Sequence, residues 1–170
     1  MRNLLLLASA FTALAAATAL SAGATTATFT LTAGALSIST PPGPVAIGAS
    51  QVASTSARTF SGPLGTVTVT DERGGTTTWV ADVISTAFTP VPASTAVPAI
   101  NVSYAPGTVT MSALVTTAKP ATTDLTGVSP VVNGASTGIS TASWNPTITV
   151  VVPANAAPGV YSGTITHSVA

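Results

Sequence analysis

The feature that most constrains the fold of this chain is a series of short segments in which β-branched residues alternate with small polar ones. One segment reads GTVTVTD (65–71) and another TWVADVISTAF (78–88), and later ones read NPTITVVVP (145–153) and GVYSGTITHSV (159–169). Val, Thr and Ile are stiff at χ1 and suit a pleated surface, and Gly or Pro separates the segments. The pattern predicts an all-β chain, folded as a two-sheet β-sandwich of the Ig-like or Greek-key type or as a small barrel.

The same alternation sets the expected strands and connections. Residues 26–39 alternate large apolar residues with Thr and Ser, which predicts a strand with a kink at its glycine. Residues 101–115 predict two short strands about a Pro-Gly turn. Two long connections are also expected: the proline-rich residues 89–99, on an extended and exposed path, and residues 116–143, with one strand at 128–132.

The first two dozen residues have the order of a secretory signal peptide. Arg2 precedes an apolar run, and the small residues Ala-Gly-Ala follow at 22–24, so we expect cleavage between Ala24 and Thr25. A membrane anchor is the alternative, but the apolar part is diluted by Ala, Thr and Ser and is short of the about 20 residues that span a bilayer. The sequence thus predicts a leader at residues 1–24 and one secreted domain at residues 25–170.

Charge and cysteine content narrow the partners of this domain. After cleavage three basic and four acidic side chains remain, a net charge of −1. Binding of nucleic acid or anionic lipid depends on clustered Lys and Arg, so neither partner is expected. The chain has no cysteine, which excludes disulfides and a lipid-bearing cysteine. We expect no integral membrane segment in the mature chain, and attachment to a cell surface by non-covalent contacts.

Few side chains are available for catalysis or metal binding. His167 is the single histidine, and its neighbour Ser168 points to the opposite face of the predicted strand, so the two cannot act as base and nucleophile. One His and no Cys cannot supply a usual zinc site. Asp71, Glu72 and Asp82 offer oxygen ligands for calcium or a carboxylate pair for glycoside hydrolysis, but Arg73 opposes a cation and sugar-binding aromatics are few. The sequence predicts a non-enzymatic protein without cofactor or metal.

Half of the eight charged side chains crowd into residues 67–83: they are Asp71, Glu72, Arg73 and Asp82. The interpretation favoured here is a hairpin of residues 67–71 and 78–87, in which Gly74 and Gly75 adopt positive φ. Arg73 then pairs with one of the three carboxylates, and Asp71 accepts backbone N–H groups in an Asx-type turn. Asp82 lies between apolar neighbours on a strand face, so it needs Arg73, Arg58 or backbone donors as partners.

Three stretches resemble the WxL domain of Gram-positive surface proteins: VTVTDERGGTTTWVADV (67–83), NVSYAPG (101–107) and ASWNPTITVVVPANAAPGVYSGTITHSV (142–169). The resemblance covers residues 36–170, and its most specific positions are Asp71, Arg73, Trp79, Pro153, Gly159, Tyr161 and Thr164. It implies an extracellular β-sandwich that associates non-covalently with the cell wall, with peptidoglycan as the partner.

Two departures from the family pattern bear on the predicted wall contact. The first motif reads Trp-Val-Ala at 79–81, with Ala where the family has Leu, and His-Ser-Val at 167–169 replaces the second motif together with its Trp. Trp79 is therefore either a wall contact or a core residue, and Trp144 resembles a loop or strand-entry residue with an exposed ring. The candidate wall contacts are Trp79, Trp144, Tyr161 and His167.

Composition alone supports a second function. A mature chain of Thr- and Val-rich strands with so few charges lacks the usual charge protection of sheet edges. Such a chain is suited to self-association, as a subunit of a surface layer or fibre that acts through β-edge contacts, or to contact with other surface proteins. Its prolines oppose this reading, because they interrupt edge ladders.

Overall fold

The computed structural model describes residues 23–118 and 121–170, and the chain divides into two units, Met1–Leu31 and Thr32–Ala170. The leader predicted at residues 1–24 lies almost wholly outside the described residues, so it stays a prediction. In the first unit, described residues 23–31 form no helix or strand, and Phe29 and Leu31 are 92% and 90% exposed. No helix within the described ranges is long and apolar enough to cross a membrane.

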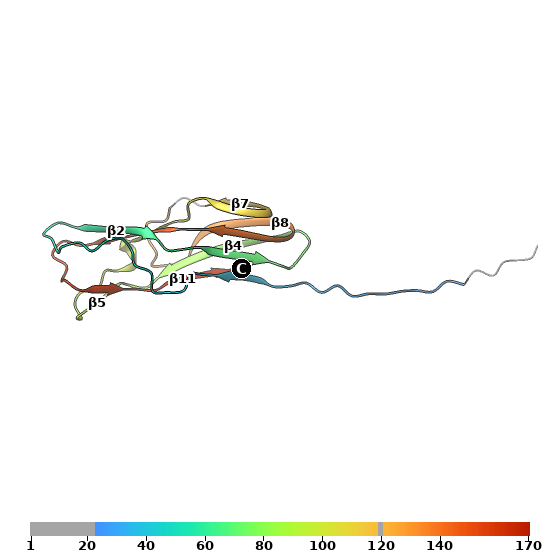
Figure 1. The fold of residues 1–170 in the computed structure, drawn as a ribbon, viewed down its shortest axis with the longest axis horizontal. Helices are drawn as coiled ribbons and strands as arrows, with labels where there is room; N and C mark the ends of the chain where they lie inside the picture. The colour runs from blue at the N-terminus through green and yellow to red at the C-terminus, as the bar shows by residue number, and fades with distance from the viewer. Residues whose placement is uncertain (1–22, 119–120) are drawn as a thin grey trace, which may run out of the picture. The chain divides into compact units, whose positions relative to one another are not determined.

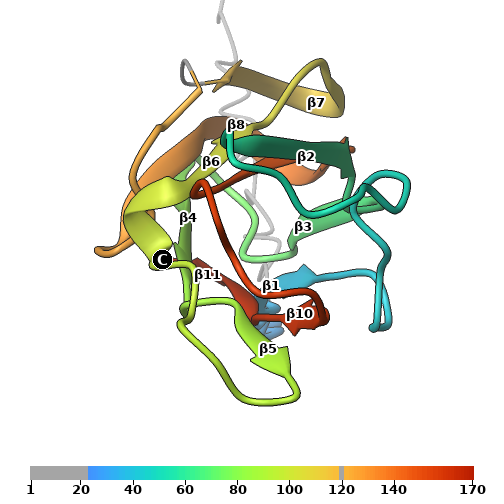
Figure 2. The ribbon, with the colours of Figure 1, turned by 90° about the vertical axis from the view of Figure 1, so that its left-hand side faces the viewer.

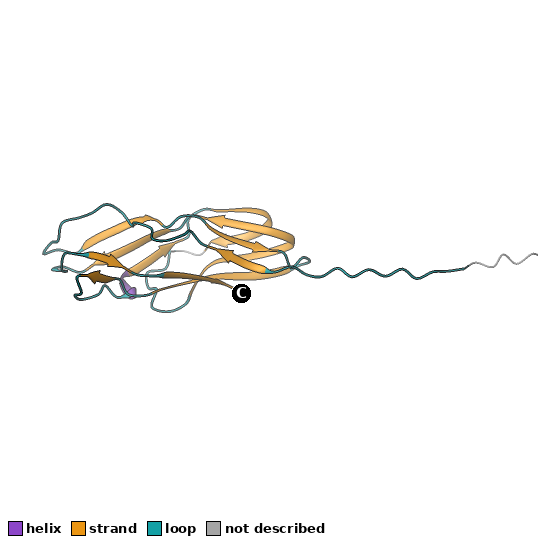
Figure 3. Cartoon of the chain, turned by 60° about the horizontal axis from the view of Figure 1, so that its bottom comes forward, coloured by secondary structure: helices purple, strands orange, loops and turns teal. Residues whose placement is uncertain are grey.

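The second unit is built from strands, with one short 3-10 turn (Figure 3). Its elements, over the described residues, are β1 (Leu36–Ser39), β2 (Arg58–Pro63), β3 (Val67–Asp71), β4 (Thr77–Ser85), β5 (Thr89–Val91), η1 (Ala99–Asn101), β6 (Val102–Ala105), β7 (Val109–Ala118), β8 (Ser129–Trp144), β9 (Thr147–Val152), β10 (Val160–Ser162) and β11 (Ile165–Val169). The predicted all-β, sandwich-like class is confirmed.

The largest sheet is organised around the long strand β8 (Figure 1). Its antiparallel order is β1-β3-β8-β4-β11, and β7 also pairs with β8. Residues 140–144 of β8 pair with β3, and residues 129–136 pair with β4. The end strands β1 and β11 also approach each other, so this six-stranded sheet is nearly closed (Figure 2).

Two smaller sheets complete the unit, one with the order β2-β9-β6 and the other formed by β10 and β5. Tyr104 of β6 forms hydrogen bonds with Trp144 of β8 and His167 of β11, so side chains of the three-stranded sheet meet those of the six-stranded sheet. The core is thus a contact between sheets, in which strand residues with alternating burial point inward. Its largest fully buried apolar side chains include Trp79, Tyr104, Leu125, Ile148, Val67 and Val69.

The predicted hairpin of residues 67–71 and 78–87 is wrong, although both strands exist. β3 and β4 pair with different parts of β8 rather than with each other. The prediction that Gly74 and Gly75 adopt positive φ is confirmed, with φ of 70° and 68°. Those glycines form the turn that separates β3 from β4, and the two strands pair with successive parts of β8, residues 140–144 and 129–136.

Three other expectations also need correction. Residues 116–143 are not a connection with one strand, because β7 extends to Ala118 and β8 runs over 16 residues. In residues 26–39 only β1 forms a strand, since the part before it lacks a partner strand. The proline-rich residues 89–99 contain β5, and Pro90 and Val97 within them are buried.

Candidate functional site

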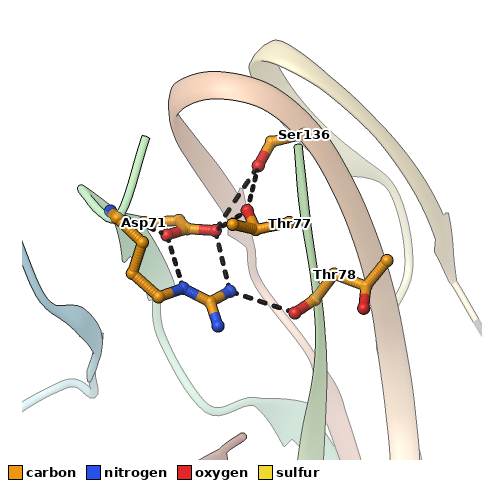
Figure 4. Close-up of polar contacts among 5 residues, drawn as sticks. Asp71, Thr77, Thr78 and Ser136 are labelled. Atoms are coloured by element: carbon orange, nitrogen blue, oxygen red, sulfur yellow. Dashed lines mark hydrogen bonds and ion pairs between the residues drawn. The ribbon is translucent and has the colours of Figure 1, made fainter. Parts of the chain in front are cut away.

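The crowded charges form a buried polar cluster where β3 ends (Figure 4). The Asp71 carboxylate, which is 0% exposed, accepts hydrogen bonds from Arg73 Nε at 2.9 Å and Arg73 Nη2 at 2.9 Å. The Arg73 backbone N–H donates to the same carboxylate at 3.1 Å, which is the expected Asx-type turn. Thr77 Oγ1 donates to it at 2.7 Å, and Ser136 of β8 also reaches it at 3.4 Å. The ribbon that carries Ser136 arches over the cluster in Figure 4.

This cluster stabilises the turn between β3 and β4, and its carboxylate is not accessible to a substrate. The hydrogen bonds from Arg73 hold the pKa of Asp71 well below its usual value, although burial acts in the opposite direction. Arg73 also donates from Nη2 to the Thr78 carbonyl at 3.0 Å, so the guanidinium holds the turn to the start of β4. An ionised carboxylate with this many donors and no exposed surface is unavailable to a substrate.

Glu72 and Asp82, the other two acidic members of the crowded segment, do not join the cluster. Glu72 is exposed, and its backbone pairs with Gly34 and Ala35. Asp82 is half-buried on β4 and, within the described residues, has neither a hydrogen bond nor an ion pair. The prediction that Asp82 pairs with Arg73, Arg58 or backbone donors is therefore wrong. Its strand face is open enough for water to solvate the carboxylate, so no protein partner is needed.

A second polar cluster joins three aromatic or imidazole side chains across the core. Trp144 Nε1 donates to Tyr104 Oη at 2.7 Å, and Tyr104 Oη lies 3.1 Å from His167 Nε2. The phenol O–H needs an acceptor, and His167 Nε2 is the one that the described contacts supply, so we assign the phenol proton to the bond with His167 Nε2. The neutral imidazole then carries its own proton on Nδ1, a buried atom without a hydrogen-bond partner in the described structure. The Tyr104 and His167 rings also meet edge to face, with centroids 5.5 Å apart.

Burial sets the protonation states of this cluster. Desolvation lowers the pKa of His167 from 6.5 to about 4, and it raises the pKa of Tyr104 above its ordinary range. His167, a half-buried residue whose Nδ1 atom is buried, is therefore neutral at pH 7. Among the described contacts its hydrogen-bond partner is Tyr104, and no Ser or Thr hydroxyl is bonded to it.

Both tryptophans are core residues, which corrects their assignment as candidate wall contacts. Each is 2% exposed, and Trp144 is the last residue of β8 rather than an exposed loop residue. Trp79 lies against Gly134, its cross-strand partner on β8, and a Cβ at Gly134 would overlap the indole ring. The indole N–H of Trp79 is buried without a partner in the described structure. Neither ring presents a face on which a polymer can stack.

Tyr161, the last candidate, lines a surface hollow of about 140 Å³. Its hydroxyl donates to the Ala157 carbonyl at 2.8 Å, which fixes the ring as one wall. Phe60 of β2 is also part of the lining, and the exposed Arg58 brings a positive charge to it. The volume is below the about 300–1,000 Å³ of pockets that enclose a small molecule, so the hollow suits one ring or side chain of a larger partner.

Sequence reasoning missed several residues that matter here. Thr77 and Ser136 complete the carboxylate cluster, and Tyr104 connects the two other aromatic positions. The role of Tyr104 could have been predicted, because alternation in residues 102–105 places it on the same face as Val102. A phenol buried on that face needs a hydrogen-bond partner. The roles of Phe60 and Arg58 could not have been predicted, since the hollow is formed by segments that are distant in the sequence.

No group of three or more His, Cys, Asp or Glu side chains able to hold a metal ion occurs in residues 23–118 and 121–170. Comparison of the chain with protein-family models, with curated proteins and with solved structures finds no match.

Proposed function

We propose that the chain is a secreted, non-enzymatic structural protein of the cell surface that is held there by non-covalent contacts. Two kinds of contact follow from the sequence: with copies of the chain itself, or with the cell wall. Contact between copies is the better supported of the two. The observation that carries it is the pair of exposed side chains Phe29 and Leu31, which alternate along a segment without secondary structure.

Large apolar side chains this exposed are costly in water, and burial of each contributes about 1.5–3 kcal/mol. Residues 26–33 alternate apolar and hydroxyl side chains, as a half-buried strand does, yet they form no strand within their own chain. Sheet edges and apolar hollows of another molecule are the usual partners of such segments. This supports self-association of the kind that builds a surface layer or fibre.

A non-enzymatic role is supported by the use of the ionisable groups. Asp71 and Arg73 neutralise each other, and His167 is occupied by Tyr104. These interactions stabilise turns and sheet contacts, and none leaves a base beside a nucleophile.

Association with the cell wall, with peptidoglycan as the partner, is the second candidate. Burial of Trp79 and Trp144 removes the aromatic contacts that the resemblance implies. The hollow with Tyr161 and Arg58 favours this candidate, because an aromatic wall and a cation suit a sugar polymer that carries carboxylates.

Two measurements on one preparation separate these candidates. The full chain is expressed with its own leader and purified from the medium, and mass spectrometry defines its N-terminus. Sedimentation velocity from about 10 µM to about 1 mM covers the range of weak protein contacts, and self-association predicts a rising sedimentation coefficient. Co-sedimentation with isolated wall sacculi tests the second candidate, with Arg58→Gln as the variant. A chain that stays monomeric and binds sacculi refutes the first candidate.

A further inference from the structure

We infer that Phe29 of one copy inserts into the hollow lined by Phe60 and Tyr161 on a second copy, so that copies join head to tail. The inference rests on the proposed self-association and adds to it the donor segment, the acceptor and their pairing. The donor is residues 25–33, the start of the mature chain after the predicted cleavage. The acceptor belongs to the folded unit Thr32–Ala170.

Size and chemistry match the hollow to a single phenyl ring. The hollow measures about 140 Å³, and apolar cavities of about 150 Å³ admit one benzene molecule. Phe60 and Tyr161 are the aromatic side chains of the lining, and Arg58 adds a cation to it, so the lining suits an entering aromatic side chain. Phe29, at 92% exposed, is the most exposed large apolar side chain in the described structure.

Leu31 also finds an apolar surface in this arrangement. In an extended segment it lies about 7 Å from Phe29 and on the same side. Gly159 lines the hollow and is followed by Val160, which pairs across the β10–β5 ladder with Val91. Val160 and Val91 are both exposed, so an apolar pair lies beside the hollow where Leu31 would pack.

The point at which the folded unit begins favours a second copy over insertion into the same chain. At the start of the folded unit, the Gly34 N–H donates to the Glu72 carbonyl at 3.0 Å, which places it beside the β3–β4 connection. The hollow is formed by residues 51–60 and 152–161. These residues include the start of β2 and the first part of β10, the partner of β5, and Figure 1 shows the start of β2 and β5 at the same end of the unit. Two different surfaces that meet in this way form a heterologous contact, which repeats from copy to copy.

The test uses one donor variant, one acceptor variant and their mixture. Phe29→Ala removes the inserted ring, and Ala53→Trp covers the hollow from an exposed lining position. Thr30→Ala is the matched control, because it changes the same segment on its opposite side. All chains keep the leader and are purified from the medium, and their urea midpoints are compared to establish that each is folded.

Sedimentation velocity then gives distinct outcomes. We expect the unaltered chain and Thr30→Ala to assemble as concentration rises, and Phe29→Ala to weaken association by about tenfold or more. Ala53→Trp alone should weaken association to a similar extent, because its hollow is covered. An equimolar mixture of the two variants should form a heterodimer and stop there, because it contains one working donor surface and one working acceptor surface.

Each contrary result overturns a defined statement. Assembly of Phe29→Ala like the unaltered chain refutes the insertion and leaves the proposed self-association standing through other contacts. A mixture that forms no heterodimer refutes the pairing of this donor with this hollow. A monomeric unaltered chain over the whole concentration range refutes the insertion and the self-association together.

Discussion

Acid should destabilise this protein well above the pH at which its carboxylates titrate, because of His167. Burial lowers the pKa of His167 to about 4, whereas the unfolded chain has the ordinary value of 6.5. Between these values the unfolded state binds more protons, so stability is full above pH 6.5 and is lost as pH falls towards 4. The linkage relation gives a loss of about 2 kcal/mol between pH 7.5 and pH 5, and about 3 kcal/mol by pH 4.

The assay is urea unfolding followed by tryptophan fluorescence at several pH values from 7.5 to 5. His167 is the only histidine, so no other imidazole contributes to the slope. Asp71 does not contribute to this slope, because its carboxylate stays ionised above pH 5 in the unfolded state and its pKa is lower still in the folded state. The stability that Asp71 contributes is lost only below about pH 4. His167→Gln keeps a polar group near Tyr104 but does not titrate, so its stability should be nearly constant over this range. An unaltered chain without a slope, or an equal slope in His167→Gln, refutes the argument.

Three substitutions test the packing of the buried clusters, each by its urea midpoint. Asp71→Asn should lower the free energy of unfolding by about 2 kcal/mol, because it removes the ion pair with Arg73. The exposed Glu72→Gln should change it by no more than about 0.5 kcal/mol. Equal effects of the two substitutions would contradict a stabilising role of this ion pair. Gly134→Ala should cost at least about 1–3 kcal/mol, because its Cβ meets the Trp79 ring, and Gly138→Ala, with open space around its Cβ, is the control. Trp144→Phe removes the donor to Tyr104 Oη and should cost about 1–3 kcal/mol; a neutral result would show that the hydrogen bond contributes nothing.

Local chemistry was predictable where neighbouring residues determine it. The positive φ of Gly74 and Gly75 and the Asp71–Arg73 pair follow from residues that are at most four positions apart. The pairing of β3 and β4 was not predictable, because alternation assigns a strand face and does not identify the partner. Their partner β8 is rich in Ser, Thr, Gly and Ala, so its own pattern is weak. Its strand conformation is supported by β3, β4 and β7, which pair along its length.

The candidate site was predicted less well than the turn, for a related reason. Alternation places Trp79 and His167 on definite strand faces but does not say which face meets the opposite sheet. The structure places Trp144, Tyr104 and His167 together from three strands of two sheets. Tyr161 alone of the four predicted contacts reaches a hollow, whose other walls come from residues 51–60 and 152–159. Convergence of such distant segments is a property of the tertiary fold and leaves no local pattern.

The position of β8 between β3 and β4 has a consequence for the order in which this chain can fold. Both sheet neighbours of β4, which are β8 and β11, come later in the sequence. A chain that emerges from a ribosome or an export channel with its N-terminus first therefore presents β4 with two bare edges until β8 has followed. Unpaired strand edges are the usual start of aggregation, and pairing over long sequence separations is slow. Until β8 and β11 have both emerged, β4 therefore lacks its sheet partners and is the strand most open to pairing with other molecules.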